Sequence, residues 1–509
     1  MSSPIEQTST SGKAPAGDGA ARARALDPTA SFCVTAPAGS GKTELLTQRM
    51  LALLARVERP EQVLAITFTR KAAAEMRDRV TEKLAEAQAD MPVTEPHEQV
   101  TRSLAEAVLE NSAARGWVLQ AECFNVRTID SLCADLTRQM PVLSALGGAL
   151  STTEQPERLF EQAVVALFAH LDDEGVTGDA LRALVLHFDN NWGRVTELLV
   201  KLLHRRGDWA PHLGQHYGPI DAENALKASV ADVVAAVLTQ VACDFTGLQE
   251  DLEQLANFAA VHLGQAPVVL APDASHLESW RCVAAMLIKD DGTWRKPKGI
   301  TVRQGFPAKT PEKARLVAIL EDLAETPVPP ALIELMRLPV IDDDDPGWQL
   351  VLQLSRLLPL LLAELLLVFQ REGVVDFTHI ALAATAALGD DEDPTDLALR
   401  LDYQLEHILV DEFQDTSDQQ FELLRRLTRG WAEHNATGAP PRTLFIVGDG
   451  MQSIYGFRYA NVGLFLRARD HGVGDLPLEP LALRRNFRSQ AGVVQWVNET
   501  FAQLLPAHD

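Results

Sequence analysis

The sequence is poor in cysteine and in positive charge, and both shortages exclude certain kinds of site and of binding. Its 509 residues include 5 cysteines, with no C-x-x-C pair and no histidine nearby at metal-ligand spacing. This pattern argues against a zinc or iron–sulfur site and predicts reduced thiols in a cytoplasmic protein. The chain has 46 Lys and Arg against 70 Asp and Glu, a formal net charge of −24. Any nucleic-acid binding must therefore come from local patches, because no global positive field attracts a polyanion.

Uninterrupted hydrophobic runs long enough to cross a membrane are also lacking. The most hydrophobic region, residues 350–369, is interrupted by polar residues and proline, which favours a buried helix pair over a membrane span. The first residues are rich in Ser, Thr, Gly, Ala and Pro and contain no apolar core that would make a signal peptide. We therefore expect residues 1–24 to form a disordered tail, and we expect no membrane contact.

A loop of small residues is the most informative stretch that is present. It follows the apolar run 31–34, precedes a leucine-rich segment, and fits the pattern G-x-x-x-x-G-K-[ST] except at its first position, which is alanine. Small residues let successive backbone N–H groups point at one anion, and the dipole of the next helix favours negative charge there. In such a loop the lysine reaches the β and γ phosphates of a nucleotide, and the last hydroxyl binds Mg²⁺. We expect a phosphate-binding loop, rather than an ordinary turn, at Ala36, Pro37, Ala38, Gly39, Ser40, Gly41, Lys42 and Thr43.

Strand and helix patterns alternate around this loop, which predicts a parallel sheet. Residues 63–68 form a strand pattern that leads into a helix pattern, and residues 407–410 and 443–447 are further apolar strands. In an open parallel sheet the ligand lies beyond the carboxyl ends of the strands, where the polar motifs of this chain follow. We therefore predict an α/β fold of the P-loop NTPase class with a large, mostly helical insertion.

Two carboxylates follow the strand at 407–410 and supply the metal ligand and the base that a nucleotide-phosphate site still lacks. Asp411 can hold Mg²⁺ opposite Thr43, and Glu412 can orient and deprotonate an attacking water. The alternative is a pair of acidic residues favoured only by a helix dipole. That alternative does not predict carboxylates directly after an apolar strand.

Phosphoryl transfer also needs hydrogen-bond donors and cations near the γ-phosphate. Gln414 and Gln452 are neutral donors suited to sensing a phosphate oxygen, although either alone is weak evidence. Arg488 is the candidate cation, and the alternative is a plain surface arginine. Its neighbour Phe487 could stack on a base.

Residues 146–375 differ in character, with long leucine and alanine patterns and few strand-like runs, which predicts a helical insertion. Within it, residues 289–315 contain eight basic and three acidic residues, a local excess of five positive charges. A solvated loop and a contact with a nucleic-acid backbone both explain this segment.

Five motifs in this chain resemble, in order and spacing, those of superfamily 1 UvrD/Rep-type DNA helicases. They are Ala36–Thr43, Thr67–Met76, Val410–Thr416, Gly448–Arg458 and Asn486–Ser489. The long insertion and the segment Val375–His379 resemble the RecB/AddA branch, whose members process double-strand DNA ends. The resemblance implies an ATP-dependent 3′-to-5′ DNA helicase or translocase of recombination and repair. Its partners would be single-stranded DNA, duplex ends and a second subunit of a helicase–nuclease complex.

Carried over to matching positions, the resemblance gives each motif residue a role. Lys42 and Thr43 would bind the phosphates of ATP and Mg²⁺, Asp411 would hold the metal, and Glu412 would be the catalytic base. Gln452 and Arg488 would contact the γ-phosphate, and Phe487 would stack on adenine. Single-stranded DNA would be contacted by Phe68, Tyr455, Phe457 and Arg458.

The resemblance also divides the chain into parts. After the tail we expect the first part of a RecA-like motor domain 1A (25–145), a 1B-like helical insertion (146–375), the second part of domain 1A (376–480) and the start of a second motor domain (481–509). No glutamine that would read adenine stands near residues 25–28, which predicts relaxed base selectivity.

The chain ends soon after Arg488, so we expect it to omit most of the second motor lobe and any nuclease domain. A lone motor half should bind ATP but hydrolyse it slowly. Two alternatives follow: a non-catalytic ATP- and DNA-binding module, and a small-molecule P-loop kinase, which the motifs at 411–416 and 452–458 disfavour.

Overall fold

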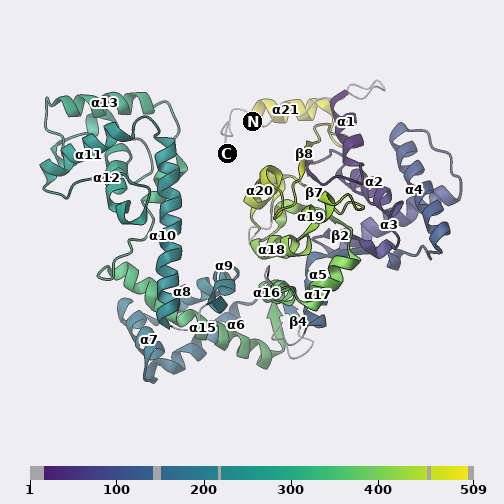
Figure 1. Cartoon of the computed structure of the whole chain (residues 1–509), viewed down its shortest axis with the longest axis horizontal. Helices are drawn as coiled ribbons and strands as arrows, with labels where there is room; N and C mark the ends of the chain where they lie inside the picture. The colour runs from purple at the N-terminus through teal and green to yellow at the C-terminus, as the bar shows by residue number, and fades with distance from the viewer. Residues whose placement is uncertain (1–15, 141–150, 216–218, 391–392, 455–459, 502–509) are drawn as a thin grey trace. The chain divides into compact units, whose positions relative to one another are not determined.

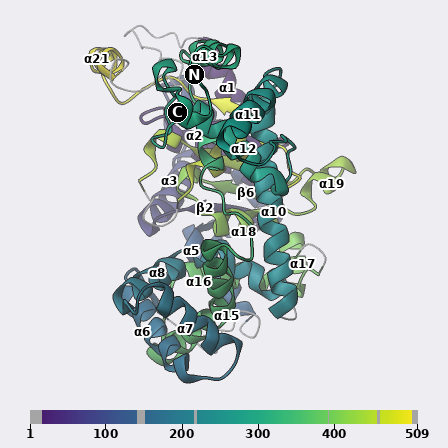
Figure 2. The ribbon, with the colours of Figure 1, turned by 90° about the vertical axis from the view of Figure 1, so that its left-hand side faces the viewer.

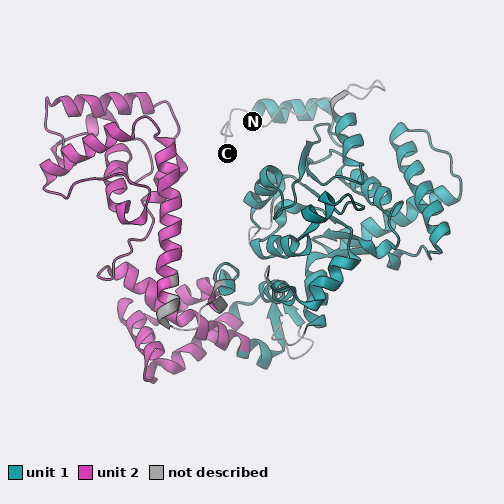
Figure 3. Cartoon of the chain, viewed as in Figure 1, with its two compact units in different colours: residues 1–158, 204–211, 367–509 teal, residues 159–203, 212–366 magenta. Residues whose placement is uncertain are grey.

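The computed structural model describes residues 16–140, 151–215, 219–390, 393–454 and 460–501. The chain forms two compact units (Figure 3). Unit 1 comprises residues 1–158, 204–211 and 367–509, and unit 2 comprises residues 159–203 and 212–366. Unit 1 is therefore assembled from three separate stretches of sequence.

Unit 1 is built on a parallel sheet of six strands, visible in Figure 1. In chain order they are β1 (Phe32–Thr35), β2 (Val63–Thr67), β3 (Asn125–Thr128), β6 (His407–Val410), β7 (Thr443–Gly448) and β8 (Glu479–Ala482). Their order in the sheet is β3-β2-β6-β7-β1-β8. β1 thus pairs with two strands from much later in the chain, and Phe32 lies opposite both Phe445 and Glu479. A separate two-stranded sheet joins β4 (Ser151–Thr153) and β5 (Val374–Asp376).

Helices follow the strands of unit 1, as the alternating pattern predicts. Thr69 and Thr128 end the strand segments and cap the next helices, since their hydroxyl oxygens accept hydrogen bonds from the N–H groups of Ala72 and Ser131. The sheet and the helices within residues 16–115 share one hydrophobic core. The helices are α1 (Ala16–Ala25), α2 (Lys42–Leu54), α3 (Arg70–Gln88), α4 (Pro96–Arg115), α5 (Ile129–Gln139), α9 (Arg206–Trp209), α16 (Phe377–Ala387), α17 (Asp396–Gln404), α18 (Asp418–Leu427), α19 (Trp431–Ala436), α20 (Val462–His471) and α21 (Ala491–Phe501).

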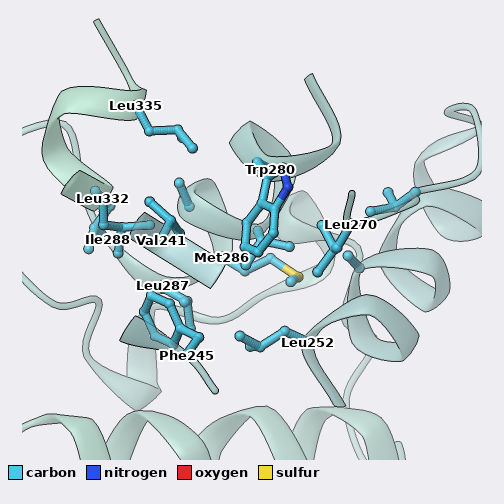
Figure 4. Packing of buried hydrophobic residues seen from close by; sticks show 14 of the residues in the cluster. Val241, Phe245, Leu252, Leu270, Trp280, Met286, Leu287, Ile288, Leu332 and Leu335 are labelled. Atoms are coloured by element: carbon cyan, nitrogen blue, oxygen red, sulfur yellow. The ribbon is translucent and has the colours of Figure 1, made fainter. Parts of the chain in front are cut away.

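Unit 2 is helical over its described residues. α6 (Glu157–Phe168) and α15 (Pro346–Glu372) connect it to unit 1, and the others are α7 (Val176–His187), α8 (Trp192–His204), α10 (Pro219–Asp244), α11 (Gln249–Leu263), α12 (Leu277–Leu287), α13 (Pro311–Leu323) and α14 (Pro330–Leu335). Figures 1 and 2 both show α6, α7 and α8 as one group and α11, α12 and α13 beside α10. The second group has a core of its own, in which Trp280 and Phe245 pack among leucines (Figure 4).

Two sequence-based expectations about segments are wrong. Residues 16–24, assigned to a disordered tail, belong to α1, because Asp18 fastens this helix by accepting a hydrogen bond from the N–H of Arg484 at 3.0 Å. The hydrophobic region 350–369 is one helix, α15, rather than a helix pair. Pro359 lies inside α15, where burial of Leu357, Leu361 and other leucines outweighs the lost backbone hydrogen bond.

Two helical segments, Leu226–Asp244 and Pro346–Glu372, are long and apolar enough to cross a membrane by length and composition alone. Core helices of soluble proteins pass the same test, and here only 17% and 28% of the two apolar windows are buried. One or two helices of this kind are weak evidence of a membrane span.

The short helix α9 returns the chain to unit 1 between the two stretches of unit 2. It carries Arg206, whose side chain is fully buried and donates a hydrogen bond to the carboxylate of Asp376. The same carboxylate caps α16 by accepting the N–H of His379 at 3.0 Å. One buried ion pair thus joins α9 to the strand–helix junction of β5 and α16.

Two buried histidines make the stability of unit 1 depend on pH. Burial lowers the pKa of His379 from 6.5 to about 4 and that of His407 from 6.5 to about 3. Below pH 6.5 these histidines therefore bind protons in the unfolded chain but not in the folded chain. The free energy of unfolding is highest at neutral pH and decreases as the pH falls from about 6.5 toward 4. We expect each histidine to lower the free energy of unfolding by about 1.4 kcal/mol per pH unit in this range.

Urea unfolding at several pH values between 7.5 and 5 checks this expectation. The variant His379→Gln should show a smaller loss of stability on acidification, whereas His97→Gln, at an exposed position of α4, should behave like the parent chain. Equal pH dependence in all three proteins would contradict it.

Candidate nucleotide site

The cluster at the carboxyl ends of β1 and β6 brings together a lysine and two carboxylates. Lys42, the first residue of α2, places its Nζ 2.5 Å from Glu412 Oε1 and 3.5 Å from Asp411 Oδ1. Both carboxylates directly follow β6. Residues far apart in the sequence thus meet where the parallel topology predicts a ligand.

Glu412 occupies a strained backbone position. Its φ of 52° and ψ of 42° lie in the left-handed region, which non-glycine residues rarely adopt. Its N–H donates to Asp411 Oδ1 at 2.9 Å, and its own Oε2 accepts from Gln414 Nε2 at 2.8 Å. The strained turn aims the Glu412 carboxylate at Lys42, and Gln414 holds it there.

Gln414 connects this turn to the end of β7. Its Oε1 accepts the N–H of Asp449 at 2.9 Å, and the carboxylate of Asp449 accepts a hydrogen bond from Gln452 Nε2. A Cβ added at Gly448 would lie 2.5 Å from Gln414 Oε1, so a larger residue here would displace the Gln414 amide. Gln452 is therefore linked to Glu412 through Asp449 and Gln414.

The loop 36–43 has the backbone form that an anion-binding loop needs. Gly39 and Gly41 both have φ of 76°, which favours glycine, and Gly41 immediately precedes α2. Ser40 Oγ is buried and has no hydrogen-bond partner within the part of the chain that the structure describes. An anion that accepted this hydroxyl would satisfy it, so the residues present fit a bound phosphate.

The segment 486–488 lies against this loop. The N–H of Phe487 donates to the carbonyl oxygen of Gly39 at 2.7 Å, and a Cβ at Gly39 would lie 2.5 Å from Asn486 Oδ1 and 2.9 Å from Arg488 Cβ. The Phe487 side chain is 57% exposed. Arg488 and Phe487 thus lie next to the loop, and their contacts with a phosphate and a base stay a prediction.

The two acidic side chains differ in burial, and burial affects the pKa of Asp411. It raises the pKa of Asp411, and the Lys42 ammonium opposes this shift. The side chain of Asp411 is 16% exposed, whereas that of Glu412 is 39% exposed. A second cation near Asp411 would stabilise its charged form further.

The donors available for a metal ion are few. Among the described residues there is no cluster of three or more His, Cys, Asp or Glu side chains. Thr43 follows Lys42 at the start of α2, with an exposed side chain, and Asp411 lies within reach of Lys42. This donor set suits Mg²⁺, which binds proteins through one or two side chains and takes its other oxygens from phosphates and water.

Phe68 belongs to a different feature of unit 1, a cavity of about 260 Å³. Its walls come from the ends of β2, β3 and β5 and from the turn after β6, with Asp130, Gln155, Asp376 and Asp415 among the lining residues. Tyr455, Phe457 and Arg458, predicted to share a DNA path with Phe68, lie outside the described residues.

Two residues near the loop were assigned no role from the sequence. Arg22, in α1, donates a hydrogen bond to the carbonyl oxygen of Ser40, and its guanidinium lies 5.3 Å from the centre of the Phe487 ring. Asp449 is the other, linking Gln414 to Gln452. A polar residue directly after β7 is a signal that could have identified Asp449, but Arg22 lies in a segment whose composition resembles a tail.

Comparison with known proteins adds to this geometry. The UvrD/REP helicase N-terminal domain family matches residues 19–236 and 352–472. An ATP-dependent helicase/nuclease subunit of Desulfitobacterium hafniense (strain DSM 10664 / DCB-2) is 28% identical over 95% of this chain and 36% of its own length. Proteins of the same name from Levilactobacillus brevis and Latilactobacillus sakei are 29% and 26% identical over 93% of this chain, and they are covered over 37% and 53% of their lengths. The chain thus spans roughly a third to a half of these relatives.

Proposed function

Because the chain belongs to the UvrD/Rep helicase family, we propose that it is the ATP-binding motor portion of a DNA helicase or translocase that acts in recombination and repair. The matching relatives are named as ATP-dependent helicase/nuclease subunits. The fold is then that of a P-loop NTPase, with loop 36–43 as its phosphate-binding loop.

One observation carries the proposal: Lys42 meets both Asp411 and Glu412 at the carboxyl ends of two strands of one sheet. A lysine for phosphate, a carboxylate for a metal and a carboxylate for a water molecule are the parts that phosphoryl transfer to water needs. In the structure both carboxylates contact the Lys42 ammonium. Binding of a triphosphate would draw Lys42 toward the phosphate oxygens and release Glu412 to act on water.

ATP and Mg²⁺ are the cofactors that this arrangement suits. Thr43 and Asp411 would hold Mg²⁺, which neutralises charge on the phosphates, while the orphaned Ser40 hydroxyl supports a phosphate in the loop. Gln452, linked to Glu412 through Asp449 and Gln414, would sense the γ-phosphate, and Arg488 would supply a further cation. Phe487 offers an exposed ring on which a base can stack.

The DNA-related parts of the proposal rest on family membership. Single-stranded DNA would pass Phe68, Tyr455, Phe457 and Arg458 with 3′-to-5′ polarity, and duplex ends and a partner subunit would complete the reaction. The cavity beside Phe68 has apolar as well as polar walls, which suits contact with a base.

DNA-stimulated ATP hydrolysis by the purified chain tests the proposal. We expect single-stranded DNA to raise the hydrolysis rate, and Lys42→Ala to lower that rate at least about 100-fold, because an electrostatic contact to the transferred phosphate is lost. Lys83→Ala, which removes a surface ion pair with Glu86 in α3, is the matched control and should retain the rate. ATP binding without any hydrolysis would favour the non-catalytic module, and phosphorylation of a small molecule without a DNA effect would favour a kinase.

A further inference from the structure

Gln414 is a buried residue whose amide is hydrogen-bonded at both ends. It lies in the turn after β6 and is 1% exposed. Its Oε1 accepts the N–H of Asp449 at 2.9 Å, and its Nε2 donates to Glu412 Oε2 at 2.8 Å. Because a backbone N–H can only donate, Asp449 fixes the oxygen of this amide toward β7 and its nitrogen toward Glu412.

The last residue of β7 leaves room for this amide. A Cβ at Gly448 would lie 2.5 Å from Gln414 Oε1 and 3.2 Å from the backbone nitrogen of Gln414. The amide therefore fills the space that a side chain at position 448 would take. It joins the turn after β6 to the turn after β7, in which Gln452 donates to the carboxylate of Asp449.

The Glu412 carboxylate contacts two side chains among the described residues. Lys42 Nζ lies 2.5 Å from its Oε1, and Gln414 donates to its Oε2. The proposed reaction needs Lys42 at the phosphates, and Gln414 is then the contact that still orients the carboxylate. The backbone of Glu412, at a φ of 52°, also needs such support, because non-glycine residues keep this conformation only where their surroundings enforce it.

We propose that Gln414 is a positioning residue for hydrolysis: it holds Glu412 Oε2, so that Oε1 faces the attacking water once Lys42 has moved to the phosphates. The inference rests on the proposed function, because it requires Glu412 to act as the base. It assigns Gln414 to the base rather than to a phosphate oxygen. The orientation of the base then depends on the backbone of Asp449, at the end of a different strand.

Single-turnover ATP hydrolysis by the full chain with Mg²⁺ and single-stranded DNA, measured between about pH 6 and pH 8, tests this assignment. Gln414→Met keeps the volume but has no donor, so it should lower the rate about 10- to 100-fold at every pH, as expected for a misplaced catalytic group. Gln414→Glu keeps the acceptor for Asp449 but places a second carboxylate beside Glu412. Its rate relative to the parent should be lowest near pH 8 and rise toward pH 6, because protonation of the new carboxyl group restores a donor.

Binding of the non-hydrolysable analogue AMP-PNP gives the second readout. Both variants should bind it as tightly as the parent chain does, because Gln414 contacts the base and not the phosphate loop. The comparison with the parent at each pH removes the titration of the other charged groups around the turn, which all these proteins share: Lys42, Asp411, Glu412 and Asp449.

Gln62 supplies a matched control near the opposite end of β6. It is 5% exposed, its Oε1 accepts the N–H of Arg59 at 2.7 Å, and its Nε2 donates to Glu406 at 2.5 Å. Gln62→Met and Gln62→Glu therefore make the same changes to another buried pair of glutamine and glutamate. Both should retain the hydrolysis rate of the parent chain over the whole pH range.

The outcomes separate two failures. If the parent chain does not hydrolyse ATP, or if Glu412→Gln hydrolyses it as fast as the parent, the proposed role of Glu412 fails and this inference fails with it. If Glu412→Gln is slow but both Gln414 variants keep the parent rate, or are slowed by one pH-independent factor, the proposed function stands and Gln414 only packs the turn. Should Gln414→Met fail to fold, the pH profile of Gln414→Glu decides between these results.

Discussion

Replacing Glu412 with glutamine is expected to slow ATP hydrolysis by this chain about 10²- to 10⁴-fold, because the variant loses the carboxylate that, in the proposed function, takes a proton from the attacking water. ATP affinity should be unchanged or higher. The reason is that Glu412 Oε1 lies 2.5 Å from Lys42 Nζ and competes with the phosphates for this ammonium. Single-turnover hydrolysis, measured beside equilibrium binding of AMP-PNP, separates the two effects.

Glu406→Gln is the control for this variant. Glu406 stands at the amino end of the same strand, where it accepts a hydrogen bond from Gln62 at 2.5 Å, and burial raises the pKa of its carboxyl group. The hydrolysis rate of this control should match that of the parent chain. If Glu412→Gln retains that rate as well, another group acts as the base.

Removing one partner of the buried Arg206–Asp376 pair should destabilise unit 1 by about 3–5 kcal/mol, because the remaining charge stays buried without compensation. Arg206 is fully buried beneath the ring of Phe369, 5.8 Å from its centre, so Arg206→Met retains apolar volume while removing the charge. Asp376→Ala also removes the acceptor that caps α16, so it should cost more. The free energy of unfolding in urea measures both losses.

An exposed ion pair serves as the control for the buried Arg206–Asp376 pair. Lys201 and Glu197 lie 2.6 Å apart on α8, with side chains 69% and 66% exposed. Lys201→Met should change the free energy of unfolding by less than about 1 kcal/mol, because solvent screens such pairs. If Arg206→Met and Lys201→Met lower the free energy of unfolding by similar amounts, the prediction that the buried pair contributes more to stability is wrong.

The strands that carry the site could be predicted from the sequence, whereas the edge strand β8 could not. β1, β6 and β7 are apolar runs that end at polar residues, so their pattern alone locates them. β8 contains Pro480 and alternates between half-buried and exposed residues, and it is an edge strand, where a missing N–H is tolerated. The short strands β4 and β5 pair across more than two hundred residues, which no local pattern can reveal.

The residues of the site also fall into a group that the sequence predicts and a group that it does not. Lys42, Asp411 and Glu412 follow strands that a parallel sheet must align, so their meeting could be predicted. Arg22 could not, because its position depends on Asp18 docking onto the backbone of Arg484, a contact between segments far apart in the sequence. The single helix α15 was missed for a related reason, since burial of its leucines outweighs the local effect of Pro359.

The position of β1 in the sheet also limits how early the site can fold during synthesis. On the ribosome, β1 emerges first of the six strands, while its neighbours β7 and β8 emerge last. At roughly 5–20 residues per second, the strand that carries the loop stays without its partners for tens of seconds. No growing chain shorter than 443 residues can hold the loop in its final surroundings. The cluster of Lys42, Asp411 and Glu412 can therefore form only late in synthesis, although its first residue is among the earliest made.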